Sequence, residues 1–213
     1  KGMLTTFSRF ADQNLFSAKY ADPYAISHPL PRERLNALEA IAKKSRYYDT
    51  PAPTSLQARH DLVRAKLLAF TSHPRTVERA YPRSDKSMAA EYARAVVAAQ
   101  SRNGKAAAKI IDGLLRQQPN NPYFYELKGQ ALLESGNPRA AIEPFRRAAA
   151  LKPREGQFLI WLGFAMVASD DPALLPEAEK VLKAGLQMDG NSPIGYQQLA
   201  IAHSRQGETA EAN

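Results

Sequence analysis

The stretch that decides the fold is residues 121–153, NPYFYELKGQALLESGNPRAAIEPFRRAAALKP. Its apolar and small residues recur at the three- and four-residue intervals of a helix face. They are Tyr125, Gly129 and Leu132, and, beyond a Gly136-Asn137-Pro138 turn, Ala141, Phe145 and Ala148. The pattern predicts two short antiparallel helices. Small residues at Gly129, Ala141 and Ala148 let the helices approach closely, while Phe145 and Tyr125 fill the space between hairpins.

The same spacing returns along the chain. Gly163 lies 34 residues after Gly129, and a second-helix pattern follows it beyond a turn lengthened by three residues. A third unit opens at Tyr196, and residues 107–119 match a second helix of the same kind. We therefore count two full repeats flanked by two partial or degenerate ones.

This hairpin pattern resembles the tetratricopeptide repeat. The resemblance implies an all-α fold in which hairpins stack into a superhelix with a concave surface that binds proteins or peptides. In this register the inner face of the first helices carries Tyr123, Glu126, Gln130, Leu133, Gln157, Ile160, Phe164, Val167, Ile194, Gln197 and Ile201. These apolar and amide groups suit an extended hydrophobic segment, a partly folded client or another domain of the same protein. The alternative is that some of them pack against neighbouring helices or against a C-terminal capping helix that would follow these residues.

The net charge of +8 is concentrated before the repeats. Residues 1–87 carry 15 Lys and Arg against 8 Asp and Glu, whereas residues 88–213 carry 14 against 13. The basic residues alternate with apolar helix positions rather than clustering beside aromatic readers, so we expect solvated or protein-docking faces and no nucleic acid. No apolar run is long enough to span a bilayer.

The leader is expected to be helical. Its pattern predicts a helix over residues 2–17, a second one beginning at Pro31 with Leu35, Leu38 and Ile41 on its buried face, and a third from about Leu56 to Phe70. His60 shares a stripe with Leu56, Val63 and Leu67, and we expect that stripe to pack into the core. The segment 45–55 reads as a turn-rich connection.

A second resemblance covers essentially the whole chain. Its marks are Gly2-Met3 in a first helix, His28-Pro29 followed by Arg34-Leu35, RAKLLAF at residues 64–70, Tyr81-Pro82, and then the repeats. In this order they resemble the C-terminal half of a bacterial HExxH zinc metallopeptidase of the HtpX-like and Ste-type family, in the periplasmic BepA-type subgroup. That resemblance implies zinc in the full-length protein and a role in envelope protein quality control.

The catalytic motif of that family is missing from these residues. The four histidines are His28, His60, His73 and His203, and no two lie three to five residues apart as zinc ligands on one helix do. We expect no catalytic residue, cofactor or hydrolytic activity in this chain. The resemblance makes His28 a possible accessory contact to the zinc of the missing domain; otherwise it has a structural role at the helix start. For His73 and His203 we expect structural roles.

Two functional hypotheses follow. In the first, residues 1–50 are the last helices of, or the linker from, a metallopeptidase domain, 51–87 connect, and 88–213 form a repeat domain that recruits substrates or partners. In the second, the chain is a stand-alone adaptor. Because residue 1 is Lys and Asn213 falls within a predicted helix, we expect a piece of a longer protein. Helices that normally rest on the missing domain would leave apolar faces bare, so self-association is expected.

Overall fold

The computed structural model describes residues 2–13 and 31–207, and the regular structure within those ranges is entirely helical. The chain divides into two compact units, Lys1–Gln57 and Ala58–Asn213. The all-α prediction is therefore confirmed for the described residues.

In the first unit, α1 (Gly2–Gln13) packs against α3 (Pro31–Lys43). Helix α3 begins at the predicted proline, whose fixed φ suits a first helical turn. Residues 14–17, which we expected to extend α1, lie outside the described residues. Ile41 was expected on the buried face of α3, but it is 68% exposed.

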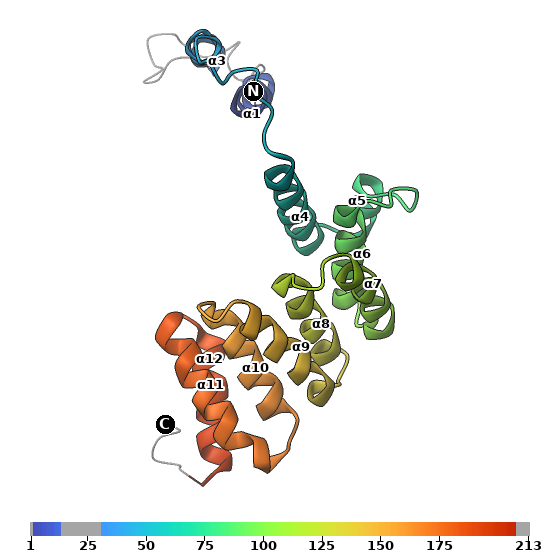
Figure 1. Ribbon diagram of the computed structural model, residues 1–213, viewed down its shortest axis with the longest axis vertical. Helices are drawn as coiled ribbons and strands as arrows, with labels where there is room; N and C mark the ends of the chain where they lie inside the picture. The colour runs from blue at the N-terminus through green and yellow to red at the C-terminus, as the bar shows by residue number, and fades with distance from the viewer. Residues whose placement is uncertain (1, 14–30, 208–213) are drawn as a thin grey trace. The chain divides into compact units, whose positions relative to one another are not determined.

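The second unit is a series of helical hairpins (Figure 1). Two helices lead into it, three pairs of first and second helices follow with a short 3₁₀ turn in the loop of the third pair, and a further first helix ends the described part of the chain. They are α4 (Thr54–Thr71), α5 (Pro74–Ala80), the pairs α6 (Met88–Gln100) with α7 (Gly104–Gln117), α8 (Pro122–Glu134) with α9 (Pro138–Leu151) and α10 (Gly156–Ala168) with α11 (Leu175–Met188), the turn η1 (Pro172–Leu174), and α12 (Pro193–Arg205). Each hairpin packs on the next, as a repeat array must to bury its apolar faces.

Gly129 and Gly163 occupy equivalent places in successive hairpins. A Cβ atom on Gly129 would lie 2.7 Å from the Phe145 ring, and one on Gly163 would lie 2.4 Å from Leu182 Cγ. In both hairpins the missing side chain lets the second helix place a large residue directly against the first. The 34-residue period is thus a repeated packing contact, as predicted.

The turn between the two helices of a hairpin also repeats. Arg102, Gly136 and Asp170 are spaced by 34 residues, and each has a left-handed backbone with φ of 54°, 77° and 54° respectively. This conformation ends the first helix and reverses the chain. Glycine adopts it without steric cost, whereas Arg102 and Asp170 are held there by the hairpin around them.

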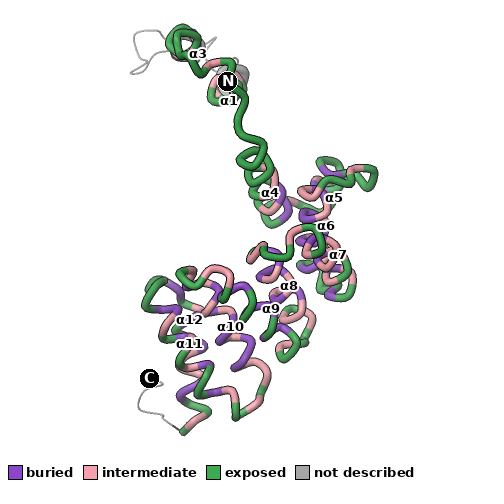
Figure 2. Tube along the Cα trace, in the orientation of Figure 1, coloured by how far each residue is buried: buried purple, intermediate pink, exposed green. Residues whose placement is uncertain are grey.

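The burial of α4 is the reverse of the prediction (Figure 2). Ala65 and Ala69 are buried in the cluster formed with α5 to α8, at 0% and 1% exposure. On the opposite side, Val63 and Leu67 are 67% and 64% exposed. The stripe that contains His60 is therefore on the outside, and our expectation that it packs into the core was wrong. Leu62 and Leu68 of α4 are partly buried and pack against the same cluster beside these alanines.

Tyr92 in α6 is a buried residue whose hydroxyl group destabilises the fold. Its ring packs edge-on against Phe124 with centroids 5.2 Å apart, and among the described residues its hydroxyl has no hydrogen-bond partner. Burial, with the nearby Glu126 carboxylate, raises the pKa of Tyr92. Ionisation of Tyr92 is therefore disfavoured in the folded state.

We expect Tyr92→Phe to stabilise the protein by about 1 kcal/mol, because it removes an unpaired buried hydroxyl without changing the ring. Because the folded-state pKa lies above the unfolded value of about 10, the stability of the native chain is complete below that pH and falls above it. Urea unfolding at pH 7 and pH 11 measures both effects. A variant that is less stable than the native chain at pH 7, or that loses as much stability at pH 11, contradicts this reading.

Candidate polypeptide-binding face

The candidate site is the face of the first helices α8, α10 and α12 that the sequence pattern assigned to ligand binding, which we call the first-helix face. It comprises Tyr123, Glu126, Gln130, Leu133, Gln157, Phe164, Ile194, Gln197 and Ile201. Tyr123 and Gln197 are exposed, Glu126 is buried, and the others are half-buried. The face therefore offers apolar surface interrupted by amide groups, which can hydrogen-bond the main chain of an extended ligand.

Two predicted members of this face are core residues instead. Ile160 is fully buried, and its side chain lies close to Gly185 and Gly195 on the two following helices. Val167 is 1% exposed. A ligand on the surface reaches neither side chain, so we remove Ile160 and Val167 from the candidate site. Ile160 is buried because α11 and α12 approach α10 closely, and Gly185 and Gly195 permit this approach.

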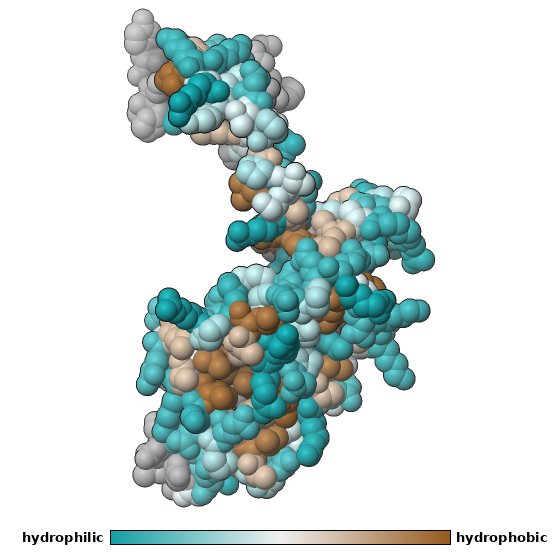
Figure 3. Space-filling model, viewed as in Figure 1, coloured by the Kyte–Doolittle hydropathy of each residue, from teal (hydrophilic) through white to brown (hydrophobic). Residues whose placement is uncertain are grey.

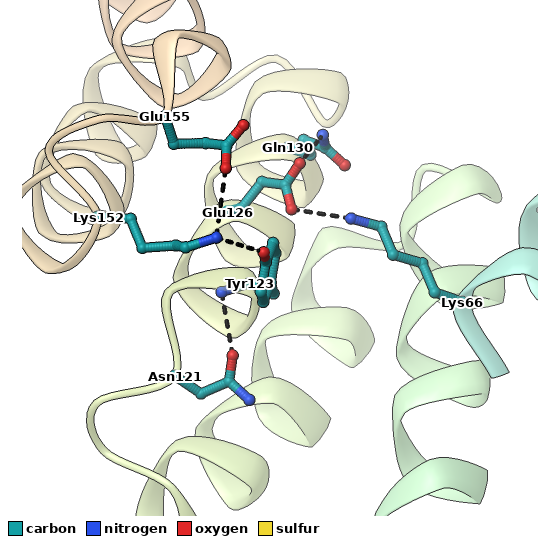
Figure 4. A network of polar contacts seen from close by, with 7 residues as sticks. All are labelled: Lys66, Asn121, Tyr123, Glu126, Gln130, Lys152 and Glu155. Atoms are coloured by element: carbon teal, nitrogen blue, oxygen red, sulfur yellow. Dashed lines mark hydrogen bonds and ion pairs between the residues drawn. The ribbon is translucent and has the colours of Figure 1, made fainter. Parts of the chain in front are cut away.

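A buried carboxylate joins the face to α4 (Figure 4). Lys66 Nζ donates to Glu126 Oε2 at 2.8 Å, and Gln130 Nε2 donates to Glu126 Oε1 at 3.4 Å. The Glu126 side chain is 9% accessible, whereas that of Lys66 is 32% accessible. Because a buried carboxylate without a partner is costly, this pair fixes α4 against α8.

Tyr123 lies between two lysines at the same place (Figure 4). Lys66 Nζ and Lys152 Nζ are 5.7 and 5.0 Å from the centre of its ring, within the range of cation–π attraction. Lys152 Nζ also donates to Tyr123 Oη at 2.7 Å, and this bond is the main cause of the raised pKa of Lys152. Glu155 accepts a second bond from Lys152 at 3.3 Å.

Sequence reasoning missed both lysines. Lys66 comes from α4 and Lys152 from the turn after α9, so neither occupies a first-helix position. Their long side chains reach the face from outside the repeat register. Only the position of Lys152 could have been predicted from the sequence. Lys152 directly precedes Pro153, which ends the repeat. In an antiparallel hairpin the end of the second helix lies beside the start of the first, which here is the start of α8.

The apolar part of the face is supported by aromatic stacking. Trp161 stacks on Phe145 with centroids 6.1 Å apart and on Phe164 with centroids 5.6 Å apart. Phe145 is fully buried, so this stack leads from the core to the half-buried Phe164. On the side shown in Figure 3, apolar side chains gather over α10 and α12.

The histidines provide no metal site among the described residues. No group of three His, Cys, Asp or Glu side chains there has the geometry to hold a metal ion. His73 caps α5 by accepting from Arg75 N at 3.2 Å, and His203 is 3% exposed, so both have structural surroundings. His28 lies outside the described residues. Within the same ranges, no helix is long and apolar enough to cross a membrane.

Comparison with known proteins agrees with this architecture. A tetratricopeptide-repeat family model matches residues 92–156 and 126–168. The two matches together cover residues 92–168, which include the pairs α6–α7 and α8–α9 and the helix α10. Stacks of this kind hold other polypeptides on the surface of their first helices, so protein–protein interaction is the function that the fold supports.

Solved structures show the same fold at low identity. One is YrrB, described as a repeat protein with an unusual peptide-binding site: it is 19% identical, with a TM-score of 0.57 over 71% of this chain and 79% of its own. Another is MamA from Desulfovibrio magneticus RS-1, 16% identical, with a TM-score of 0.58 over 73% of this chain and 88% of its own.

One relative extends beyond the repeats. The beta-barrel assembly-enhancing protease of Yersinia pestis is 25% identical over 214 residues, which cover 97% of this chain. The chain spans only 42% of the length of that relative.

Proposed function

We propose that this chain is the non-catalytic, repeat-bearing part of an envelope zinc metalloprotease and that it presents polypeptide substrates or partners for protein quality control. The observation that carries the proposal is the extent of the likeness to the protease relative. It covers 97% of the chain, so it includes the leader as well as the repeats. A likeness due to the repeats alone would be confined to the second unit.

In this proposal the catalytic zinc site is formed by residues other than those that the structure describes. The residues here do not fit a zinc site, because the described ranges offer no cluster of three suitable side chains. In the proposal, zinc and its HExxH helix belong to another part of the full-length protein, in the cell envelope. His28 as an accessory contact to that zinc, and the protease domain as a partner of this chain, are parts of the same proposal.

The first-helix face suggests the class of substrate. It combines the half-buried Phe164 and Ile201 with the amides of Gln130 and Gln197, and the paired Lys66 and Glu126 leave little net charge beside them. Such a surface suits an extended segment that alternates apolar and polar residues, as a strand of a β-barrel does before it pairs. We infer that the repeats hold unfolded segments of this kind.

A stand-alone adaptor is the second candidate. The family match is confined to residues 92–168, and the similar solved structures are repeat proteins. The two candidates differ in what is encoded upstream. An HExxH motif in the same reading frame supports the protease, and its absence from the complete gene leaves the adaptor.

Binding to a labelled peptide of alternating phenylalanine and serine residues tests the face itself. We expect saturable binding in fluorescence anisotropy and a loss of about tenfold in affinity in Phe164→Ser, because a central aromatic side chain contributes much of the energy of such an interface. Circular dichroism controls for folding of the variant. Equal binding by a folded Phe164→Ser variant contradicts the assignment.

A further inference from the structure

The outer side of α4 is an apolar stripe that the second unit does not cover. His60, Val63, Leu67 and Phe70 follow one another at intervals of three, four and three residues, and we call them the outer α4 seam. The His60 side chain is 65% accessible, and Val63, Leu67 and Phe70 are 67%, 64% and 40% exposed. The buried alanines on the opposite side mean that rotation of α4 cannot hide this stripe without exposing the cluster beneath.

The spacing identifies the kind of surface that fits this seam. Intervals of three and four residues are those of the inward positions in paired helices, where each side chain enters a space between residues of the facing helix. A helix that lies on a membrane instead presents a much broader apolar face. Here the exposed apolar stripe is one or two side chains wide, because Arg59 and Lys66 lie along one edge and Arg64 along the other.

The charges at the edges select the partner. In a second copy of the chain, arginines would meet arginines across the seam whether the helices ran parallel or antiparallel, because both edges are basic. Lys66 is engaged by Glu126, which leaves Arg59 and Arg64 as the cations that face a partner. Acidic residues on either side of an apolar stripe complement this arrangement.

We propose that the outer α4 seam docks an amphipathic helix of another polypeptide, one whose apolar stripe is flanked by Asp and Glu. This surface adjoins the first-helix face at Lys66, whose Nζ lies 5.9 Å from the centre of the Phe70 ring, but it faces away from the side of α4 that carries the buried Ala65 and Ala69. The chain thus has one face for an extended segment and another for a folded helix. The second face gives the protein a fixed partner while the first remains available to substrates.

The test uses the whole 213-residue chain and two designed helical peptides. Both have leucine at the inward positions, and they differ only in having glutamate or lysine at the edges. We expect the glutamate peptide to bind at least about tenfold more tightly than the lysine peptide, with an affinity that falls as salt is added. The double variant Arg59→Glu/Arg64→Glu should reverse this preference.

The double variant Val63→Gln/Leu67→Gln supplies the second arm. Both side chains are largely exposed, so the helix content and melting temperature should be unchanged while binding of the glutamate peptide falls by about tenfold or more. Phe164→Ser serves as a matched control that leaves this binding intact. The phenylalanine–serine peptide should bind to Val63→Gln/Leu67→Gln as tightly as to the native chain. Failure of the seam proposal is therefore distinguishable from failure of the proposed first-helix face.

Three results overturn the proposal. The first is equal binding of the glutamate peptide to the native chain and to Val63→Gln/Leu67→Gln. The second is a dimer in sedimentation equilibrium that this variant abolishes, which makes the seam an interface between copies. The third is binding to phosphatidylglycerol vesicles, lost in the same variant, without binding to either peptide, which makes the seam a lipid-binding surface.

Discussion

Gly163→Ala destabilises the repeat stack by about 2–3 kcal/mol, because the added methyl group enters a packed contact. Its Cβ would lie 2.4 Å from Leu182 Cγ, and Leu182 is fully buried in the cluster of α9 to α12. The branch point of a buried leucine cannot move aside as the end of an exposed side chain can. Gly129→Ala should behave in the same way, since its Cβ would meet the buried Phe145 ring at 2.7 Å.

The matched control is the identical substitution at another helical glycine. Gly113 lies within α7, and the nearest atom to a Cβ there is Nη2 of Arg116 at 3.6 Å. Gly113→Ala therefore gains helix propensity without a clash and should stabilise the protein by about 0.5–1 kcal/mol. Urea denaturation followed by circular dichroism measures both substitutions. Changes of the same sign at positions 113 and 163 would refute the close packing contact that we assign to Gly163.

The second large effect is expected from Lys66→Ala, which leaves the Glu126 carboxylate buried and, among the described residues, with only a long hydrogen bond from Gln130. Breaking a buried pair from one side costs several kcal/mol, and the partial exposure of Lys66 reduces this to about 2 kcal/mol. The loss should be concentrated where α4 meets α8. Hydrogen exchange should then show faster exchange of α4 amides than in the native chain.

Lys128→Ala is the control for this prediction. Lys128 Nζ is 2.7 Å from Asp112 Oδ1, and the lysine has a similar exposure to Lys66, but the Asp112 carboxylate is 45% accessible. Removing Lys128 leaves a carboxylate that water can solvate, so the cost should stay below about 1 kcal/mol. If the two substitutions cost the same in urea unfolding, the burial of Glu126 does not govern the joint between α4 and the repeats.

The hairpin fold could be predicted because its determinants are local and repeat. Gly129 and Gly163 identify the period, and the residue that packs against each lies in the second helix of the same hairpin, Leu182 being three residues further on than Phe145 because its turn is longer by three. The helix starts were likewise predictable where a proline such as Pro31 marks them. These features need no knowledge of distant contacts.

The faces of α4 could not be predicted in the same way. Its pattern contains a stripe of large apolar residues around Val63 and a set of alanines around Ala65, and hydrophobicity favours burial of the larger residues. In the structure Ala65 and Ala69 are buried instead, with Leu62 and Leu68 partly buried beside them, because this side of α4 faces the cluster formed with α5 to α8. The prediction that Ile160 lies on the binding face was wrong for a related reason, because the burial of Ile160 depends on glycines in two later helices.

We claim that the first helices of the repeats hold an extended polypeptide, and a photo-crosslinker attached at position 197 should then lie beside the bound ligand. The chain contains no cysteine, so Gln197→Cys and Gln187→Cys each accept a single benzophenone label. Both positions are exposed glutamines, but Gln197 lies on the first-helix face of α12 and Gln187 on α11, the second helix of its hairpin. With the phenylalanine–serine peptide we predict crosslinking from position 197 and little from position 187; equal crosslinking from both, or more from position 187, contradicts the claim.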